Sequence, residues 1–573
     1  IKDSVFLVNG QPVKVKGVNR HESHPETGHY VTPEQMEEEV RMMKRANINH
    51  VRCSHYPADP YFYYLCDKYG IYVQDEANIE SHGYYYGKES LSHPIEWMPA
   101  HVDRIMAMVE RNKNHPCVIM WSLGNEAGPG QNFRSAEKMV KARDMSRPTH
   151  YERNNDIVDL GSNQYPSVDW TRSMAGNKDF PKPYYISEYA HNMMNAMGNL
   201  ADYWEAIESS DRIMGGAIWD WVDQGILEKD KNGREYYTYG GDYGVNAPSD
   251  GNFLCNGIVN PDRTPHPAMA EVKYAHQNIG FEAIDLANGL FRVTNRFYFT
   301  NLKKYMVHYS VTANNKVVRS GKVSLDIEPQ ASKEFTVPVG NLKPQAGTEY
   351  FVNFNVTTVE KEPLIPIGHE IACDQFRLPI ESPKKAFKTS GPKLTVSTNG
   401  DNLSASSSKV NFMFNKKTGI VTSYKVDGTE YFSEGFGIQP NFWRAPTDND
   451  YGNGMPKRLQ VWKESSKNFN VTDATVTMDG NNAVVNVNYL LPAGNLYIVN
   501  YTIYPSGAVN VAARFTSTDM DAAQTEVSES TRTATFTPGR DAARKEASKL
   551  NVPRIGVRFR LPASMNQVEY FGR

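Results

Sequence analysis

The chain has 573 residues, of which 40% are apolar and 22% charged, and its formal net charge is −3. Such a length exceeds one hydrophobic core and predicts three or four domains. The small net charge gives no electrostatic basis for binding nucleic acid or an anionic membrane, and no apolar run approaches the roughly 20 residues that cross a bilayer. Five widely spaced cysteines without a Cys-x-x-Cys pair indicate neither a disulfide framework nor a zinc site, so we expect free buried thiols.

Residues 12–277 contain short apolar runs that alternate with helical patterns. The runs are nearly continuous in apolar residues, which is typical of parallel strands covered on both faces. One helix is expected to start with Thr32 as N-cap and Pro33 at its first position. The alternation predicts a (β/α)8 TIM barrel, with a doubly wound open sheet as the alternative, although no Gly-x-Gly-x-x-Gly follows the first run. The expected strands are Val13–Val18, Asn49–Cys53, Ile71–Asp75, Val118–Leu123, Thr149–Glu152, Asp159–Gln164, Tyr184–Glu188 and Gly215–Trp221.

Beyond residue 278 the pattern changes to alternating, β-rich runs that are separated by turn residues. We therefore expect a barrel at 1–277, an antiparallel β-sandwich at 278–380, a Pro/Ser/Lys/Gly-rich linker at 381–394 and a second all-β domain at 395–573. Within the last region, a lysine-rich stretch at Arg540–Leu550 has a helical pattern.

Carboxylates and imidazoles are concentrated directly after the expected barrel strands, whose ends meet at one mouth. Glu126 and Glu188 each follow a buried strand, in "WSLGNEAG" and "YYISEYAHN". Two carboxylates across one mouth are what glycoside hydrolysis needs, because one protonates the leaving oxygen while the other attacks the anomeric carbon or activates water. The alternative is that both acids are structural ion-pair or capping residues.

The stretch "ANIESHG" suggests a metal site, because Glu80 and His82 are two residues apart and point to the same side of an extended segment. With Glu126 nearby they could hold one hard cation such as Mg²⁺. The alternative is that these are solvated polar residues. The stretch "RHESHP" lacks the His-Glu-x-x-His spacing of a zinc site, and "DNDYG" lacks the closing glutamate of a calcium loop.

Taken together, the motifs resemble the glycoside hydrolase family 2 β-galactosidases of the bacterial lacZ type. The resemblance runs through nearly the whole chain and is densest over residues 1–275. It implies that the barrel is followed by an immunoglobulin-like β-sandwich and by a large β-sandwich that is incomplete at its C-terminus, with further domains before the barrel. The motifs that carry it are "GVNRHESHP", "VRCSHYP", "DEANIESHG", "WSLGNEAG", "SEYAH", "WDWVDQ", "DRTPHPAMAEVK" and "RAPTDND".

The resemblance implies a retaining hydrolase that releases β-D-galactose through a covalent galactosyl-enzyme. Glu188 matches the nucleophile and Glu126 the acid/base. The residues implied to bind the substrate or to orient the nucleophile are His21, Arg52, His55, Asn125, Tyr165, His191 and Trp219. Among them, Asn125 matches the contact to the sugar 2-hydroxyl, His191 a contact to the 6-hydroxyl and Trp219 the platform under galactose.

The resemblance also implies two cations, a partner class and a compartment. Glu80, His82 and Glu126 match magnesium ligands, and the Phe253 carbonyl and Asn256 match sodium ligands, with one further sodium ligand expected from a domain outside this chain. The implied partner is a β-galactoside, either lactose or a glycan, bound by a homo-oligomer in the bacterial cytoplasm, with the periplasm as the alternative location. Two alternatives to this function stay open. One is another family 2 glycosidase, a β-glucuronidase or β-mannosidase, and the other is a non-catalytic carbohydrate-binding chain.

Overall fold

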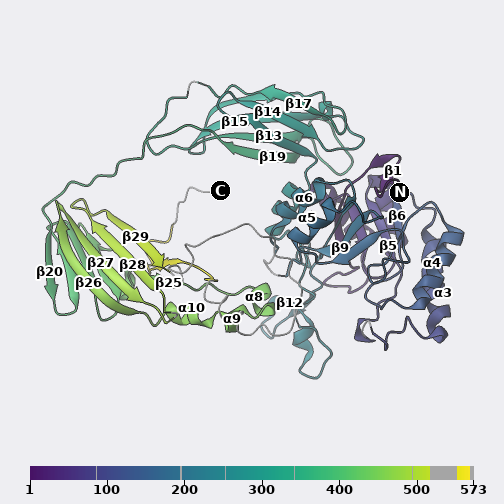
Figure 1. The fold of residues 1–573 in the computed structure, drawn as a ribbon, viewed down its shortest axis with the longest axis horizontal. Coiled ribbons are helices and arrows are strands. Elements are labelled where there is room, and N and C mark those ends of the chain that lie inside the picture. The colour runs from purple at the N-terminus through teal and green to yellow at the C-terminus, as the bar shows by residue number, and fades with distance from the viewer. Residues whose placement is uncertain are drawn as a thin grey trace. The chain divides into compact units, whose positions relative to one another are not determined.

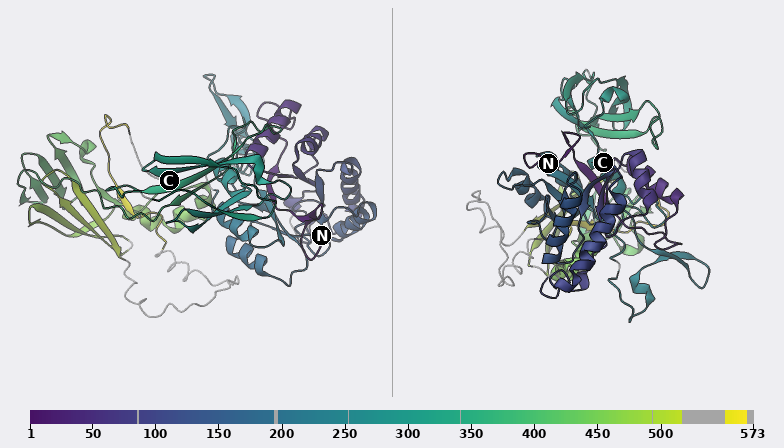
Figure 2. Two further views of the ribbon diagram at one scale, coloured as in Figure 1. Left: turned by 90° about the horizontal axis from the view of Figure 1, so that it is seen from above. Right: turned by 90° about the vertical axis from the view of Figure 1, so that its right-hand side faces the viewer.

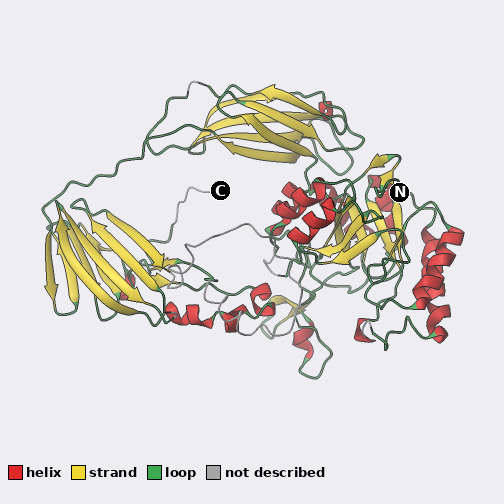
Figure 3. Ribbon diagram, viewed as in Figure 1, coloured by secondary structure: helices red, strands yellow, loops and turns green. Residues whose placement is uncertain are grey.

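The structure is a computed structural model that describes residues 1–84, 87–193, 197–251, 253–340, 342–492, 494–516 and 551–567 (Figure 1). The chain divides into two compact units, Ile1–Ser382 and Pro383–Arg573. The first unit contains a parallel sheet followed by antiparallel sheets, and the second contains antiparallel sheets with a few short helices (Figure 3). Among the described residues, no helix is both long enough and apolar enough to span a membrane.

The parallel sheet is a nearly closed barrel, as the sequence predicted. Its eight strands are hydrogen-bonded in the order β7-β6-β5-β4-β3-β10-β9-β8. Each expected strand corresponds to one of them, which excludes the doubly wound sheet. Their bounds are β3 Val15–Arg20, β4 His50–Cys53, β5 Tyr72–Glu76, β6 Val118–Ser122, β7 Thr149–His150, β8 Gly161–Gln164, β9 Tyr184–Tyr189 and β10 Ile213–Ile218.

Helices pack on the outside of the barrel, and local sequence signals set several of their ends. In α1, Thr32 and Gln35 form a capping box and Pro33 is the first residue, as predicted. In α2, Asp59 caps the N-terminus and Gly70, at φ +74°, ends the helix in the left-handed conformation that favours glycine. The helices are α1 Pro33–Arg45, α2 Pro60–Tyr69, α3 Met98–Asn112, α4 Gln131–Arg143, α5 Val168–Gly176, α6 Leu200–Glu208 and α7 Ala268–Ala275.

Two hydrophobic clusters fill the two faces of the barrel strands. Val51, Val73 and Ile186 belong to the larger cluster, together with apolar residues of the surrounding helices. Because successive strand residues point to opposite faces, their neighbours point into the barrel. There, Tyr185 belongs to a smaller cluster that also contains Val15, Met120, Leu160 and Met214. The barrel is therefore packed at its centre, so polar groups that react with a ligand must lie at its ends.

The antiparallel region of the first unit is a two-sheet sandwich. One sheet has the order β13-β14-β17 and the other β16-β15-β18-β19. Burial alternates along β14, where Phe291, Val293 and Asn295 point inward. The strands are β13 Ile279–Asp285, β14 Leu290–Asn295, β15 Tyr305–Ala313, β16 Lys316–Val323, β17 Ser332–Thr336, β18 Tyr350–Thr358 and β19 Glu370–Arg377.

This sandwich packs on the barrel through hydrogen bonds as well as apolar contacts. The Asn47 side chain donates to the Ile371 carbonyl at 3.0 Å, and the Cys373 amide donates to Gln277 at 3.0 Å. In Figure 2 the sandwich, drawn in teal, lies beside the barrel helices. Within the barrel domain, the long helices α3 and α4 pack against each other.

The second unit has its own core. Its larger sheets are β20-β21-β22-β23-β24 and β26-β27-β28-β29, and a short pair joins β25 to β30. One hydrophobic cluster draws residues from both larger sheets, including Phe412, Phe414, Tyr489 and Tyr501. The strands are β20 Thr395–Asn399, β21 Asn402–Ser406, β22 Val410–Asn415, β23 Ile420–Val426, β24 Thr429–Glu430, β25 Gln439–Asn441, β26 Asn470–Asp479, β27 Asn482–Leu490, β28 Leu496–Ile503, β29 Val509–Thr516 and β30 Gly556–Arg558.

Three expectations have different outcomes. The helical pattern at Arg540–Leu550 lies outside the described residues. The exact domain boundaries at 277, 380 and 394 stay predictions. No disulfide bond links the five cysteines, all of which lie in the described part of the chain. Cys53, Cys66 and Cys117 are buried as expected, whereas Cys255 and Cys373 are half-buried.

Candidate active site

The polar residues expected at the barrel mouth lie at the C-terminal ends of the strands and bond to one another. Arg52 on β4 is at their centre and is completely buried. Its guanidinium donates to Glu76 at 2.9 Å, to Glu188 at 2.8 Å and to the Asn125 side-chain oxygen at 2.8 Å. One cation therefore fixes the positions of two carboxylates and one amide.

Glu76, at the end of β5, balances the charge of Arg52. Burial alone would raise the pKa of its carboxyl, but Arg52 and His55 lower that pKa to about 2. His55 Nδ1 lies 2.7 Å from Glu76 Oε1, and the Ser122 hydroxyl donates to Oε2 at 2.7 Å. Glu76 is thus an anion at neutral pH, and its two carboxylate oxygens keep Arg52 and His55 in place.

Glu188 lies at the end of β9 and is 4% exposed. Its Oε1 accepts a hydrogen bond from Arg52 and a second one, of 2.9 Å, from the Gln164 side chain. Beside it, Tyr165 has a raised pKa because its hydroxyl is desolvated and faces the Glu188 carboxylate. Glu188 is therefore oriented by a cation and an amide, as a carboxylate nucleophile requires.

Glu126 lies in the loop after β6, and its side chain is more accessible than that of Glu188. Arg153 Nη2 donates to Glu126 Oε1 at 3.0 Å and to the Gln164 side-chain oxygen at 2.9 Å. Because Gln164 also bonds to Glu188, Arg153 and Gln164 form a bridge between the two glutamates. The structure thus brings Glu126 and Glu188 to the same mouth.

Glu80, His82 and Glu126 form a potential metal site. One ligand atom from each lies within 4.8 Å of the others, and His82 Nδ1 is 3.0 Å from Glu126 Oε2. Desolvation, reinforced by the neighbouring Glu126 carboxylate, raises the pKa of Glu80. A divalent cation would offset this crowding of negative charge, so two carboxylate oxygens and an imidazole nitrogen fit such an ion.

An aromatic wall lies beside these acids. The Trp219 ring stacks on His55 with centroids 5.3 Å apart, and His21 contacts the Trp219 edge at 5.3 Å. His21 Nδ1 is 3.3 Å from a carboxylate oxygen of the buried Asp220. An indole with one imidazole stacked on it and another perpendicular to it combines apolar surface with several hydrogen-bonding groups, which suits a sugar ring.

The remaining predicted residues continue this wall. The His191 ring contacts Tyr165 at 5.8 Å and Phe253 at 6.0 Å, and desolvation lowers the His191 pKa. The Phe253 carbonyl accepts a hydrogen bond from the Asn256 side chain. Asn256 is 3% exposed, and its Oδ1 has no hydrogen-bond partner among the described residues. A buried carbonyl-type oxygen in this state fits a cation ligand.

Sequence reasoning missed two residues of the site, Gln164 and Arg153. Gln164 is the last residue of β8, and Arg153 follows the expected strand Thr149–Glu152. Both obey the rule that polar residues at strand ends face the mouth, so the ends of the fifth and sixth expected strands contain the signal that could have indicated them. Glu152, whose pKa burial raises to about 7, forms an ion pair with Arg153.

Comparison with known proteins identifies the family. Residues 1–281 match the family described as "Glycosyl hydrolases family 2, TIM barrel domain", residues 291–379 match "Beta-galactosidase, domain 4", and residues 406–573 match "Beta galactosidase small chain". The chain belongs to glycosyl hydrolase family 2. In this family 2 chain the barrel is followed by antiparallel β domains, which is the order that the sequence motifs implied.

Individual relatives agree with this assignment. A β-galactosidase from Priestia megaterium is 37% identical over 89% of the chain and 50% of its own length. A β-galactosidase from Photobacterium profundum is 37% identical over 79% of the chain and 45% of its own length. A solved β-glucuronidase from Ruminococcus gnavus is 22% identical, with a TM-score of 0.39 over 48% of this chain and 51% of its own. The chain thus spans about half the length of the β-galactosidases that it matches.

Proposed function

We propose that this family 2 chain carries the catalytic residues of a retaining β-galactosidase. The observation that supports this most is the fixed, buried carboxylate of Glu188, held by Arg52 and Gln164 at the mouth that also contains Glu126. In the first step the Glu188 carboxylate attacks the anomeric carbon, while Glu126 gives its proton to the departing glycosidic oxygen. In the second step Glu126 removes a proton from water, which displaces Glu188 and releases the sugar with its anomeric configuration retained.

The substrate class is proposed from the chemistry of the wall and from the names of the relatives. Trp219 offers apolar ring surface, and His21, His55 and His191 offer hydrogen-bonding groups. A β-glucuronidase would need a cation for the substrate carboxylate. Here Arg52 is buried among Glu76, Glu188 and Asn125, and Arg153 bonds to Glu126. These features favour a neutral sugar over a uronic acid, and the names of the relatives favour a galactoside, either lactose or a glycan.

The two proposed cations have separate roles. Glu80, His82 and Glu126 would hold Mg²⁺, which would fix the orientation of the Glu126 carboxyl group. The Phe253 carbonyl and Asn256 Oδ1 would contribute to a Na⁺ site. Without a bound ion, His82 and Arg153 already orient Glu126 from its two oxygens. A homo-oligomer in the bacterial cytoplasm, with the periplasm as the alternative, stays a prediction.

The test is a panel of aryl β-galactosides, β-glucuronides and β-mannosides. We expect preference for galactosides and a loss of about 10⁴-fold or more in turnover for Glu188→Gln, because the nucleophile is removed. Glu126→Gln should slow poor leaving groups by about 10²–10⁴-fold and activated aryl groups much less.

Glu39→Gln is the matched control, because Glu39 is also a buried barrel glutamate but pairs with Arg20 and Arg263 instead. Its turnover per folded molecule should be unchanged. Unchanged turnover in Glu188→Gln would refute the assignment, and preference for glucuronides or mannosides would give another family 2 activity. Galactose binding without turnover would indicate a carbohydrate-binding chain.

A further inference from the structure

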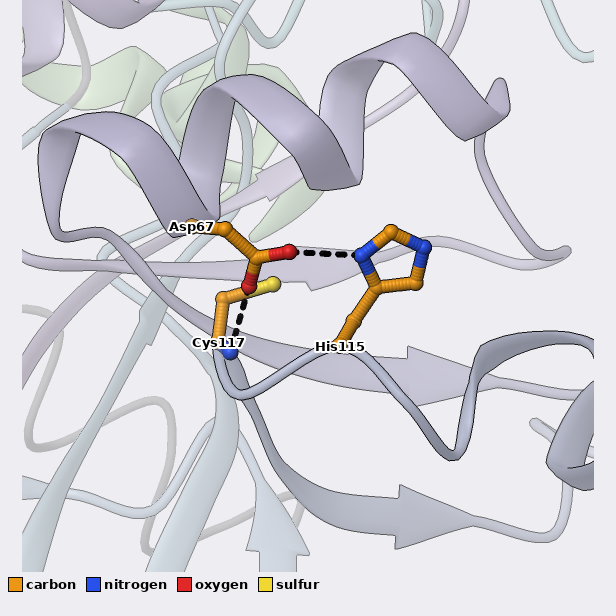
Figure 4. Close-up of side chains that lie close together, drawn as sticks. All are labelled: Asp67, His115 and Cys117. Atoms are coloured by element: carbon orange, nitrogen blue, oxygen red, sulfur yellow. Dashed lines mark hydrogen bonds and ion pairs between the residues drawn. The ribbon is translucent and has the colours of Figure 1, made fainter.

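Asp67, His115 and Cys117 form a cluster at the opposite end of β6 from Glu126 (Figure 4). Asp67 lies on α2, whereas His115 and Cys117 lie in the segment that joins α3 to β6. His115 Nδ1 is 2.6 Å from Asp67 Oδ2, and the Cys117 amide donates to Asp67 Oδ1 at 2.8 Å. The Asp67 carboxylate thus ties a helix to the segment that leads into β6.

The Cys117 thiol lies beside this pair. Cys117 is 6% exposed, and its Sγ donates a weak hydrogen bond to the Tyr63 carbonyl at 3.6 Å. The sulfur also points to the carboxylate and imidazole, and one ligand atom from each of the three residues lies within 4.8 Å of the others. The cluster thus brings together a thiol, an imidazole and a carboxylate, which are donor types that bind transition metals.

The chemistry of these donors selects the metal. Zn²⁺ binds thiolate at about 2.3 Å and imidazole or carboxylate at about 2.0–2.2 Å in a tetrahedron, which places neighbouring donors about 3.3–3.8 Å apart. The three ligand atoms, which lie within 4.8 Å of one another, would move to these separations to surround such an ion. Mg²⁺ and Ca²⁺ are excluded as the natural metal ions of this site, because they prefer oxygen donors to a soft thiolate.

The surroundings supply access and support. Asp67 and Cys117 line a cavity of about 410 Å³, together with Tyr72, Pro116 and Tyr298. The side chains of Asp67 and His115 are 22% and 26% exposed, so a hydrated ion can reach them and a water molecule can take the fourth position. The Cys117 amide holds the carboxylate, and the Tyr63 ring lies 5.3 Å from the His115 ring. Such outer contacts orient metal ligands.

We propose that Asp67, His115 and Cys117 form a zinc-binding site that clips α2 to the segment preceding β6. On binding, the Cys117 thiol releases its proton to solvent, and His115 coordinates through Nδ1 while its ring proton moves to Nε2. Asp67 coordinates through Oδ2, and its Oδ1 keeps the hydrogen bond from the Cys117 amide. The site is independent of the proposed hydrolase activity, and it would stabilise the strand that leads to Glu126.

Cobalt(II) is the probe, because a thiolate bound to Co²⁺ gives a near-ultraviolet charge-transfer band. The full chain is freed of metal with a chelator, kept reduced with a phosphine, and titrated first with Co²⁺ and then with Zn²⁺. We expect a band that saturates at one Co²⁺ per chain and is abolished by Zn²⁺, together with a rise of several degrees in the unfolding midpoint. The cluster of Glu80, His82 and Glu126 has no thiol and cannot produce this band.

Single substitutions show which residues bind the Co²⁺ ion. Cys117→Ser should abolish the band, and His115→Gln, which can still bond to Asp67, should keep a thiol but weaken Co²⁺ binding by about 10²-fold or more. Cys373→Ser is the control, because Cys373 is a half-buried thiol outside the cluster. The Co²⁺–thiolate band of this variant should equal that of the parent protein. Near-ultraviolet circular dichroism checks that each variant is folded. No thiolate band in the parent protein, or a band that persists in folded Cys117→Ser, would overturn the proposal.

Discussion

The barrel mouth and the sandwich at residues 279–377 use buried space in opposite ways. At the mouth, Arg52, Glu76 and Asp220 are completely buried, and Glu188 is nearly so. In the sandwich the buried cluster is apolar, with Phe291 and Phe354 in edge-to-face contact at 4.9 Å. Charged residues such as Arg292 stay on its surface, where that guanidinium pairs with Glu282 and Glu334.

The difference shows which region is built for chemistry. Removing charges from water costs several kcal/mol per ion, and well-packed apolar residues usually stabilise a core as well or better. The buried cluster of the sandwich consists of such apolar residues. The mouth keeps its buried charges, which is expected where a carboxylate must be oriented and kept reactive. Four changes test this contrast.

The largest effect is expected for Arg52→Met. It leaves Glu76 and Glu188 buried without their shared cation, so the free energy of unfolding should fall by about 3–5 kcal/mol. Turnover per folded molecule should also fall by about 10²–10³-fold, because the nucleophile loses a charged donor. Urea denaturation and steady-state kinetics measure the two losses separately.

Arg20→Met is the matched control for this change. Arg20 is also a buried arginine of the barrel, and it pairs with Glu39 at 2.7 Å. Its loss should lower stability by a similar amount and leave turnover per folded molecule unchanged. Equal losses of turnover in both variants would show that Arg52 acts only through stability.

A substitution in the core of the sandwich should lower stability without changing turnover. Phe291→Ala removes a ring that contacts Phe354 and Phe376, so the free energy of unfolding should fall by about 3–5 kcal/mol. Turnover per folded molecule should not change, since the mouth keeps all its groups. A kinetic defect in the folded variant would contradict the division between the two regions.

Acid should destabilise the mouth more than the sandwich. The pKa of Glu76 is lowered from 4.5 to about 2, so its contribution to stability is fully present above about pH 4.5 and is lost as pH falls through about 2. The full loss amounts to about 3 kcal/mol. Urea denaturation at about pH 5 and about pH 3 should show a smaller pH dependence in Glu76→Gln than in the parent protein. If the free energy of unfolding changed equally with pH in both proteins, Glu76 would not be held as an anion.

The smallest effect is expected for Arg292→Ala. Both of its ion pairs are exposed to solvent, so the loss in free energy of unfolding should be at most about 1 kcal/mol. High salt should remove most of that loss, because it screens exposed charges. A loss as large as that of Arg52→Met would remove the contrast between the mouth and the surface of the sandwich.

Much of the fold could be predicted from the sequence, and the reason differs between elements. Barrel strands such as β4 and β9 are covered on both faces, so they appear as apolar runs. The hairpin of β11 Ile226–Lys229 and β12 Glu235–Thr238 was missed, because its strands are largely exposed and lack such a run. Its turn contains Asn232-Gly233, a hairpin signal that could have indicated it.

The sequence predicted that Glu126 and Glu188 lie at the barrel mouth, because an apolar strand run precedes each of them, and their catalytic roles stay predictions. The bridge made by Arg153 and Gln164 could not be predicted, because a hydrogen bond between a loop and the end of β8 depends on the closure of the barrel rather than on local sequence. The same limit applies to Asp67 and Cys117, which are 50 residues apart and meet only when α2 packs beside β6. Spacing along the chain could not indicate that cluster.

The central claim is that Glu188 forms a covalent bond to the sugar. A 2-deoxy-2-fluoro-β-galactosyl fluoride tests it most directly, because its fluorine slows both chemical steps while its leaving group favours the first, so the intermediate accumulates. Peptide mass spectrometry of the inactivated protein should show one fluorogalactosyl group on Glu188. Attachment to another residue, or continued turnover of galactosides without any labelled protein, would contradict the account.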